Sequence, residues 1–312
     1  MAPLTTAGHT DLGKGCHAWL PHDGGWGLSN AGLIAGRGES LLVDTLFDVR
    51  LTRRMLAGLQ QVTAEAPIER VVNTHGNGDH WFGNQMLRDR EIIAAAPTAE
   101  DMRAVGPDDV RAMLAHPGAT GTVARRIFGA FDFGEVVATY PTTVFDGELD
   151  LVVGGVHVRL IDVGPAHTAG DTIVHVPSAG VVYTGDIVFA GGTPIVWHGP
   201  IANWLRACDR IDALGPATIV PGHGPVTTVR AVHAQAAYLR FVQEEATLRQ
   251  AKGMTFHEAA HDIDLGDYAC LPERERLIVN VHAVYRELDP ETPPLDGPAA
   301  FACMGDFMED LL

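Results

Sequence analysis

The segment 71–80 constrains the fold of this chain more than any other part, because an apolar, β-branched run ends there and ligand-type side chains follow at once. His75, Asn77, Asp79 and His80 lie within six residues, and the glycines between them let the backbone turn. Two imidazoles, a carboxylate and an amide oxygen at the end of a buried strand are typical of a metal site, since a metal needs rigidly held ligands. The alternative interpretation is a polar turn that happens to contain two histidines.

Three later segments have the same design, in which an apolar run ends in a ligand-type residue flanked by glycine. These runs lead to His167, Asp186 and His223. A histidine or aspartate after a strand is common in loops, so each segment alone is a weak indication. Their occurrence in order after the first motif favours one metal site over four unrelated turns.

On these motifs the chain resembles the metallo-β-lactamase-fold hydrolase superfamily, from about Trp19 to about Arg249. The resemblance implies an α/β fold, a four-layer αβ/βα sandwich with C-terminal helices, and a dinuclear metal site at the ends of the strands. It also implies a catalytic domain over residues 1–252, with residues 253–312 as a helical extension packed on it.

The resemblance assigns seven side chains to two divalent ions: to the first ion His75, Asn77 and His167, to the second Asp79, His80 and His223, and Asp186 as the bridge between them. Asn77 departs from the pattern, because the family usually has histidine there. An amide oxygen is a poorer ligand than imidazole for zinc. We therefore expect Zn²⁺, with iron or manganese as alternatives, and a first site that is weaker than the second.

Such a centre would lower the pKa of bound water and polarise a substrate carbonyl. The expected activity is hydrolysis of a thioester, lactone or related ester, with metal-bound hydroxide as the nucleophile. Asp79 is the expected catalytic residue, because it could both hold the metal and orient the water or take up its proton. Asp44, at the end of an apolar run, is either a partner for a ligating histidine or a turn or helix N-cap residue.

Two further interpretations remain open. The segments 24–26, 29–32 and 83–85 resemble those of bacterial polyketide thioesterases and cyclases, so the second interpretation is metal-dependent cyclisation of an aromatic polyketide. The third is a non-catalytic metal-binding protein in which Asn77 marks a decayed first site. The filled ligand positions disfavour it. Hydrolysis of β-lactams is disfavoured because no export signal is visible at the N-terminus.

Three residues outside the motifs are candidates for substrate contacts. Trp26 lies in an early Gly-rich hairpin that is either a flap over the site or an ordinary turn. Trp197 and His198 follow Asp186, in a loop expected on the same edge as the metals, although an exposed loop histidine would explain His198 equally simply.

Composition narrows the partners. A formal net charge of −17 and a pI near 5.2 disfavour nucleic acid and anionic membrane surfaces, which leaves a small-molecule or carrier-bound acyl substrate. Four dispersed cysteines without a CxxC pair indicate reduced thiols and a cytoplasmic protein, and no apolar run has the length of a membrane span. Apolar positions on one face of the segment 272–288 fit either core packing or a homodimer interface.

Periodicity predicts an alternation of strands and helices typical of an α/β sandwich. Strands are expected at 17–20, 28–35, 41–44, 68–73, 91–95, 149–153, 156–163, 172–176, 180–184 and 217–220. Helices are expected at 49–62, as a pair within 97–135, and at 201–214, 227–251, 256–261 and 272–288, with 289–298 extended.

Overall fold

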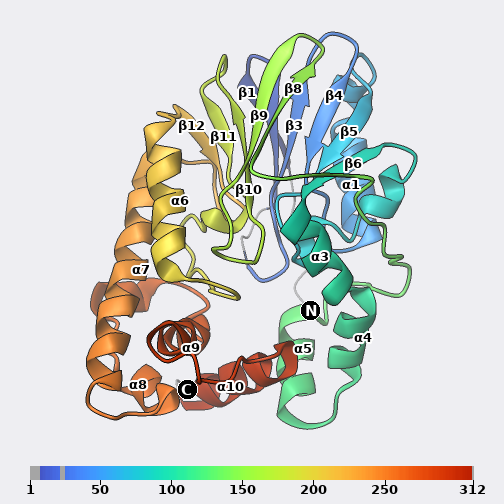
Figure 1. Cartoon of the computed structure of the whole chain (residues 1–312). Coiled ribbons are helices and arrows are strands. Elements are labelled where there is room, and N and C mark those ends of the chain that lie inside the picture. The colour runs from blue at the N-terminus through green and yellow to red at the C-terminus, as the bar shows by residue number, and fades with distance from the viewer. Residues whose placement is uncertain (1–7, 22–24, 311–312) are drawn as a thin grey trace.

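The computed structural model describes residues 8–21 and 25–310, and two β-sheets lie face to face at its centre (Figure 1). Gly24, at the start of the segment 24–26 noted in the sequence, lies outside the described residues. The first sheet has seven strands in sequence order: β1 (Gly8–Gly13), β2 (Cys16–Leu20), β3 (Ala31–Ala35), β4 (Ser40–Val43), β5 (Ile68–Val72), β6 (Glu91–Ala95) and β7 (Thr143–Phe145). The second has five, in the order β12 (Thr218–Val220), β11 (Val181–Tyr183), β10 (Thr172–Val176), β9 (Val156–Asp162) and β8 (Glu148–Val153).

Alternation along the strands explains why the two sheets pack together. Val72 of β5 points between the sheets, whereas its neighbour Val71 points outward. In the second sheet Val174 of β10 points inward and Ile173 outward. Side chains of a strand face opposite sides with a period of two, so strands that are apolar on both faces must be covered on both faces.

Helices cover the two outer faces. The first sheet is covered by α1 (Val49–Gly58), which is followed by the short α2 (Gln60–Thr63) and buries Met55 against Leu42 and Val71. The second sheet is covered by α6 (Ile201–Ala213) and α7 (Val229–Gln250). The expected four-layer sandwich is thereby confirmed.

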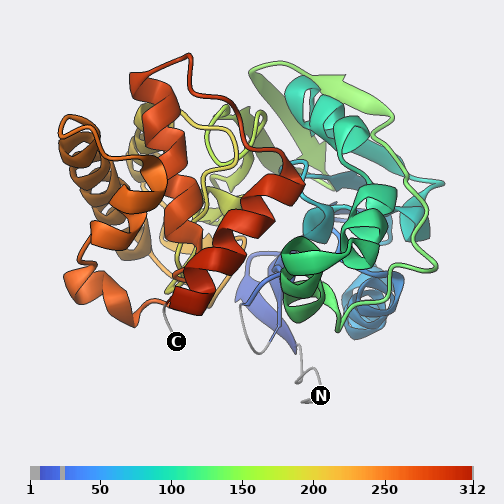
Figure 2. The ribbon, with the colours of Figure 1, turned by 90° about the horizontal axis from the view of Figure 1, so that it is seen from below.

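The remaining helices gather below one edge of the sandwich (Figures 1 and 2). They are α3 (Ala96–Ala104), α4 (Pro107–Ala115) and α5 (Gly118–Phe128) on one side, and α8 (Phe256–Asp262), α9 (Arg276–Leu288) and α10 (Gly297–Asp310) on the other. Figure 2 shows α10 crossing from the side of α9 to α5. Ala300, Phe301, Met304 and Phe307 of α10 are buried in the same apolar cluster as Phe128 of α5.

The apolar face of α9 belongs to that cluster as well. Leu277, Val281 and Val284 are at most 1% exposed, whereas Leu288 is 45% exposed. Core packing within the chain therefore explains this face. Among the described residues, no helix is long and apolar enough to cross a membrane.

Four local expectations were wrong. The segment 97–135 contains three helices, because the breaks at Pro107 and Pro117 separate three pieces where we expected two. The segment 289–298 is not extended throughout, since α10 begins at Gly297. The polar strand β1 and the three-residue β7 were not expected. Trp81 and Phe82 are buried in a turn between two short 3-10 helices, Gly78–His80 and Asn84–Leu87.

Candidate metal centre

The chemically reactive side chains lie where strands end. Strands β4 to β7 run parallel to one another, and so do β11 and β12. The segments that follow β5, β11 and β12 therefore start from one edge of the sandwich. His75 follows β5, Asp186 follows β11 and His223 follows β12. His167 lies in the connection from β9 to the antiparallel β10, at the same edge.

Glycine is required beside two of these side chains. A Cβ atom at Gly222 would lie 1.9 Å from Oδ1 of Asp186, so only glycine lets the His223 loop approach that carboxylate. A Cβ atom at Gly78 would lie 2.5 Å from the ring of Phe82, which fills the space beneath the first motif. The glycines noted in the sequence thus allow close packing around the site.

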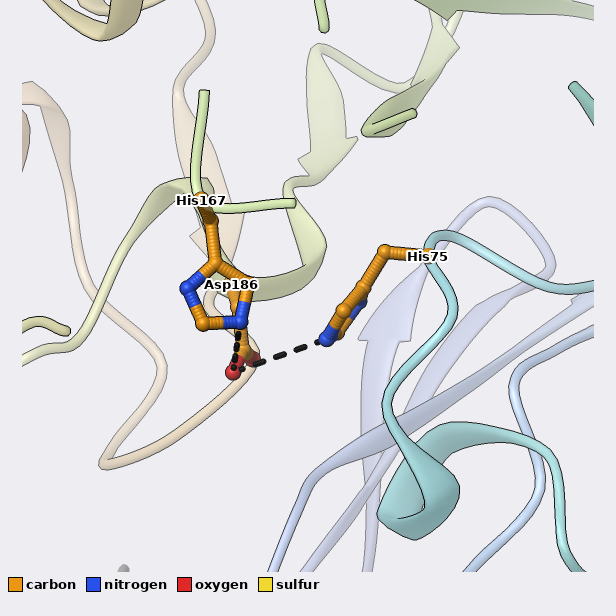
Figure 3. A group of neighbouring side chains, drawn as sticks. All are labelled: His75, His167 and Asp186. Atoms are coloured by element: carbon orange, nitrogen blue, oxygen red, sulfur yellow. Dashed lines mark ion pairs between the residues drawn. The ribbon is translucent and has the colours of Figure 1, made fainter. Parts of the chain in front are cut away.

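The first group consists of His75, His167 and Asp186, whose ligand-type atoms all lie within 4.8 Å of one another. Nε2 of His75 is 3.7 Å, and Nε2 of His167 is 3.4 Å, from Oδ2 of Asp186. Figure 3 shows both imidazoles pointing toward that carboxylate, from the two halves of the chain.

The second group consists of Asp79, His80 and His223, again within 4.8 Å of one another. Nε2 of His223 lies 3.3 Å from Oδ2 of Asp79 and 3.3 Å from Oδ2 of Asp186. Nε2 of His80 lies 3.1 Å from Oδ1 of Asp186. Asp186 therefore touches both groups, as a residue that bridges two ions must.

Asn77 lies beside the first group. Its side chain is half-buried, and its Oδ1 is 2.7 Å from Nε2 of His167. The structure thus brings together all seven side chains that the sequence singled out as ligands, Asn77 included.

The hydrogen-bond pattern fits divalent cations. Nε2 of His75, Nε2 of His80 and Oδ1 of Asp186 are buried, and none makes a well-aligned hydrogen bond among the described residues, although the last two lie 3.1 Å apart. The opposite nitrogens of two of the histidines are engaged, since Nδ1 of His80 is 2.9 Å from Asp44 Oδ2 and Nδ1 of His167 is 2.7 Å from the carbonyl of Ile195. Nδ1 of His223 is buried without a hydrogen-bond partner among the described residues. Buried polar atoms without partners are costly, and a cation held by the inward nitrogens would satisfy them.

Asp44 is placed against a ligand-type histidine. Its carboxylate is 2% exposed and also accepts hydrogen bonds from the backbone N–H (2.7 Å) and hydroxyl (2.8 Å) of Thr74. Its backbone has φ of 65°, a left-handed conformation that aspartate and asparagine tolerate better than most residues. The N-cap of α1 is Asp48. Of the two interpretations of Asp44, the structure therefore shows the contact with His80.

The electrostatics of the centre demand positive charge. Burial alone would raise the pKa of Asp186, but His223, His80 and His75 hold it well below its usual range. Burial alone would lower the pKa of His223, yet Asp186 and Asp79 raise it to about 9. Two buried carboxylates thus need protons on the histidines or cations in their place, and a metal competes with those protons.

A cavity of about 300 Å³ opens onto the two groups. Asp79, Asp186, His167 and His223 line one part of it. The remainder is lined mainly by apolar side chains: Trp26, Phe47, Val110, Met113, Phe128, Phe189, Ile195, Trp197 and Phe301. The cavity therefore joins a polar floor to an aromatic wall.

The three candidates for substrate contacts, Trp26, Trp197 and His198, all line this cavity. The indole of Trp26 donates a hydrogen bond from Nε1 to Glu275 Oε1 (2.9 Å), and the guanidinium of Arg276 lies 3.9 Å from its ring centroid. Trp26 is therefore packed against the start of α9. His198 is exposed and Trp197 is half-buried.

Several lining residues were missed by sequence reasoning. Phe47, Phe128, Arg276 and Phe301 come from separate segments and carry no shared motif. Phe301 belongs to α10, which was not expected. Its only signal was the apolar spacing after residue 297, visible as Ala300, Phe301 and Met304.

Comparison with known proteins agrees with this geometry. Residues 24–223 match the family model of the Metallo-beta-lactamase superfamily. A hydroxyacylglutathione hydrolase of Cupriavidus metallidurans is 26% identical over 201 residues, which cover 64% of this chain and 58% of that protein. One of Brucella ovis is 26% identical over 167 residues, which cover 51% of this chain and 52% of that protein. The chain thus spans little more than half the length of these relatives.

Solved structures show the same fold at low identity. The stereoselective inverting sec-alkylsulfatase Pisa1 from Pseudomonas sp. has a TM-score of 0.67 at 18% identity, covering 93% of this chain and 52% of that one. The metallo-beta-lactamase FIM-1 from Pseudomonas aeruginosa in its mono-zinc form has a TM-score of 0.55 at 21% identity, covering 75% of this chain and 94% of that one.

Proposed function

Because the chain belongs to the metallo-beta-lactamase superfamily and has the fold of its metal-binding hydrolases, we propose that it hydrolyses a thioester, lactone or related ester. The observation that carries the proposal is the pair of groups that share Asp186 and open onto one largely apolar cavity. The names of the relatives support it, since an acylglutathione is a thioester. The proposed substrate is a small or carrier-bound acyl compound.

Two divalent ions, for which we propose Zn²⁺, would lower the pKa of bound water and polarise the substrate carbonyl. His75, Asn77 and His167 would hold one, Asp79, His80 and His223 the other, and Asp186 both. The first would be held more weakly, because Asn77 offers an amide oxygen.

Asp79 is the group that handles the proton. Its carboxylate lines the cavity with its Oδ2 3.3 Å from His223 Nε2. Burial alone would raise the pKa of Asp79, but His80 and His223 lower it, so the carboxylate is ionised at neutral pH. An ionised carboxylate accepts a hydrogen bond from the attacking water, orients it toward the carbonyl and takes up its proton.

The surrounding residues position substrate and ligands. Asp44 binds Nδ1 of His80 and thereby directs Nε2 toward the centre. The wall that includes Trp26 and Phe301 excludes water from the acyl group and holds its carbonyl at the polar floor. The leaving thiol or alcohol departs through the open side of the cavity.

A second candidate is metal-dependent cyclisation of an aromatic polyketide, and the aromatic lining of the cavity favours it. There the carbonyl-adjacent C–H would lose its proton to Asp79. The two candidates differ in product: hydrolysis yields a carboxylic acid and a free thiol or alcohol, whereas cyclisation yields a new carbon–carbon bond.

Metal analysis of the protein, purified without chelator, is the first test. About two equivalents of zinc, iron or manganese per chain support the dinuclear centre, and about one supports a mononuclear centre on Asp79, His80 and His223. If the protein contains no metal even after reconstitution, the proposed hydrolase activity is wrong and a non-catalytic binding protein is favoured.

Asp79→Ala then tests the mechanism. We expect turnover of any thioester or lactone substrate to fall by about 10²-fold or more while the protein stays folded, because the proton acceptor and one proposed ligand of the second ion are both lost. Asp108→Ala, on the exposed surface of α4, serves as the control and should retain full activity. Retained activity in Asp79→Ala would remove Asp79 from the mechanism.

A further inference from the structure

We propose that the cavity selects an aromatic acyl group of about two fused rings, carried on a leaving group without negative charge. This inference rests on the proposed function and names the substrate class of the same site. It depends on the ring packing, the volume and the charges of the cavity.

Aromatic rings form a continuous wall. The ring centroid of Trp26 lies 6.1 Å from that of Phe128, 6.4 Å from that of Trp197 and 6.1 Å from that of Phe301. Trp197 and Phe301 are nearly parallel, with 11° between their planes. Flat aromatic ligands pack against such a wall by stacking and edge-to-face contacts, which add to the effect of burial.

The wall is held in place before any ligand arrives. Trp26 is fixed from α9 by Glu275 and Arg276, and Phe301 is 4% exposed in α10, which packs on α5. A rigid aromatic wall loses little side-chain entropy when a ligand binds. It favours a rigid, flat acyl group over a flexible chain of similar volume, because the flat group also has little entropy to lose.

The volume sets the size of that group. An apolar cavity of about 150 Å³ is enough to bind benzene. The cavity of about 300 Å³ therefore suits about two fused rings, with the attached carbonyl at the floor beside Asp79 and Asp186. An acetyl group would leave most of the wall without contact.

Away from the proposed metal centre, the side-chain charges of the cavity disfavour anionic carriers. Apart from histidines, Arg276 is the one cationic side chain among the described lining residues, and Glu273 already pairs with it, Oε2 lying 3.0 Å from Nη1. Asp101, also in the lining, adds a carboxylate, and the whole chain carries a formal charge of −17. Glutathione carries two carboxylates and one ammonium group, coenzyme A carries several phosphate charges, and their anionic groups find no unpaired cationic side chain in this lining.

A matrix of substrates tests the proposal with the metal-loaded enzyme. Acetyl, benzoyl and 2-naphthoyl groups are each attached to the neutral thiol N-acetylcysteamine and, separately, to glutathione. We expect kcat/KM to rise at least about tenfold from acetyl to 2-naphthoyl on N-acetylcysteamine. We expect each glutathione thioester to be poorer than its N-acetylcysteamine counterpart by about tenfold.

Each outcome of the matrix has a distinct meaning. If kcat/KM for the acetyl thioester equals or exceeds that for the 2-naphthoyl thioester, the proposed selection of an aromatic acyl group is wrong. If glutathione thioesters have the higher kcat/KM, the proposed preference for an uncharged carrier is wrong. Absence of hydrolysis throughout contradicts the proposed function rather than the ligand class, and the ligand class is then decided by binding alone.

Calorimetry with neutral amides provides that independent measurement. We expect 2-naphthamide to bind one molecule per chain, at least about tenfold more tightly than benzamide, whether or not the protein turns over thioesters. Binding of 2-naphthamide no tighter than that of benzamide would overturn the proposal.

Variants of the wall locate the effect. Phe301→Ala should lower kcat/KM for the 2-naphthoyl thioester by about tenfold and leave the acetyl thioester within about twofold, because only the larger group reaches the wall. Phe301→Leu keeps most of the buried volume and serves if the alanine variant fails to fold. Leu248→Ala, on the exposed face of α7, is the control and should leave kcat/KM unchanged for both thioesters. Equal loss for both thioesters would contradict the assigned role.

Discussion

At the scale of single residues, Asp44 orients the ligand-type residue His80 although Asp44 itself does not line the cavity. Asp44→Asn keeps the size of the side chain and tolerates the left-handed backbone with φ of 65°, so it removes mainly the charge beside His80. We expect metal affinity to fall by about 10- to 100-fold. Competition with a chromophoric chelator measures the affinity.

The chain offers a matched control for that change. Asp48 is also buried, four residues away, and its Oδ1 accepts the Leu51 N–H at the start of α1 (2.6 Å). Asparagine is an equally good N-cap, so Asp48→Asn should leave metal affinity unchanged. If both variants lose affinity equally, the contact between Asp44 and His80 has no special role.

Asn77 decides the strength of the proposed first site. Asn77→His places an imidazole where the amide now lies, close to Nε2 of His167, and imidazole is the better zinc ligand. We expect the affinity for the weaker ion to rise by about tenfold or more. Stoichiometry and affinity from calorimetry check this, with Asn77→Ala as the comparison that removes the ligand altogether. No change in either variant would mean that residue 77 holds no metal.

At the scale of elements, the first turn of α9 connects the C-terminal helices to the cavity. Arg276 is 1% exposed, donates from Nη1 to the carbonyl of Thr193 (2.7 Å) and pairs with Glu273. Arg276→Met leaves the Glu273 carboxylate largely buried without its partner, which we expect to reduce the free energy of unfolding by about 3–5 kcal/mol. Urea denaturation measures it.

A double-mutant cycle separates this charge effect from lost packing. Glu273→Gln in the Arg276→Met background removes the uncompensated carboxylate, so most of the lost stability should return. If the double variant is as unstable as the single one, packing of Arg276 on Trp26 and not the ion pair accounts for the loss.

The same elements show what the sequence can and cannot predict. The ligand-type residues follow strands that are short apolar runs, and these runs end in glycine-containing motifs. The fold class and the convergence of the ligand-type side chains on one site could therefore be predicted from local sequence pattern. The cavity wall is different, because Trp26, Phe128 and Phe301 meet only through the packing of α5, α9 and α10. Asp44 was left between two interpretations for the same reason: its contact with His80 spans 36 residues.

At the scale of the whole molecule, the candidate centre joins the two halves of the sandwich. His75, Asp79 and His80 follow the first sheet, whereas His167, Asp186 and His223 belong to connections of the second. Ions held in common would cross-link the sheets along one edge. A ligand that binds only the folded state, at a concentration about 100 times its Kd, raises the free energy of unfolding by about 2.7 kcal/mol.

Removal of metal should therefore lower the melting temperature by about 4 °C for each such ion, and added Zn²⁺ should restore it. Amide exchange would locate the change. The amides around Asn73 and Thr184, at the ends of β5 and β11, should exchange faster without metal. The amide of Arg37, bonded to the carbonyl of Gly154 beside the start of β9, lies at the opposite edge and should not change. Faster exchange in one sheet alone would mean that the ions are held by one half of the chain and do not join the two.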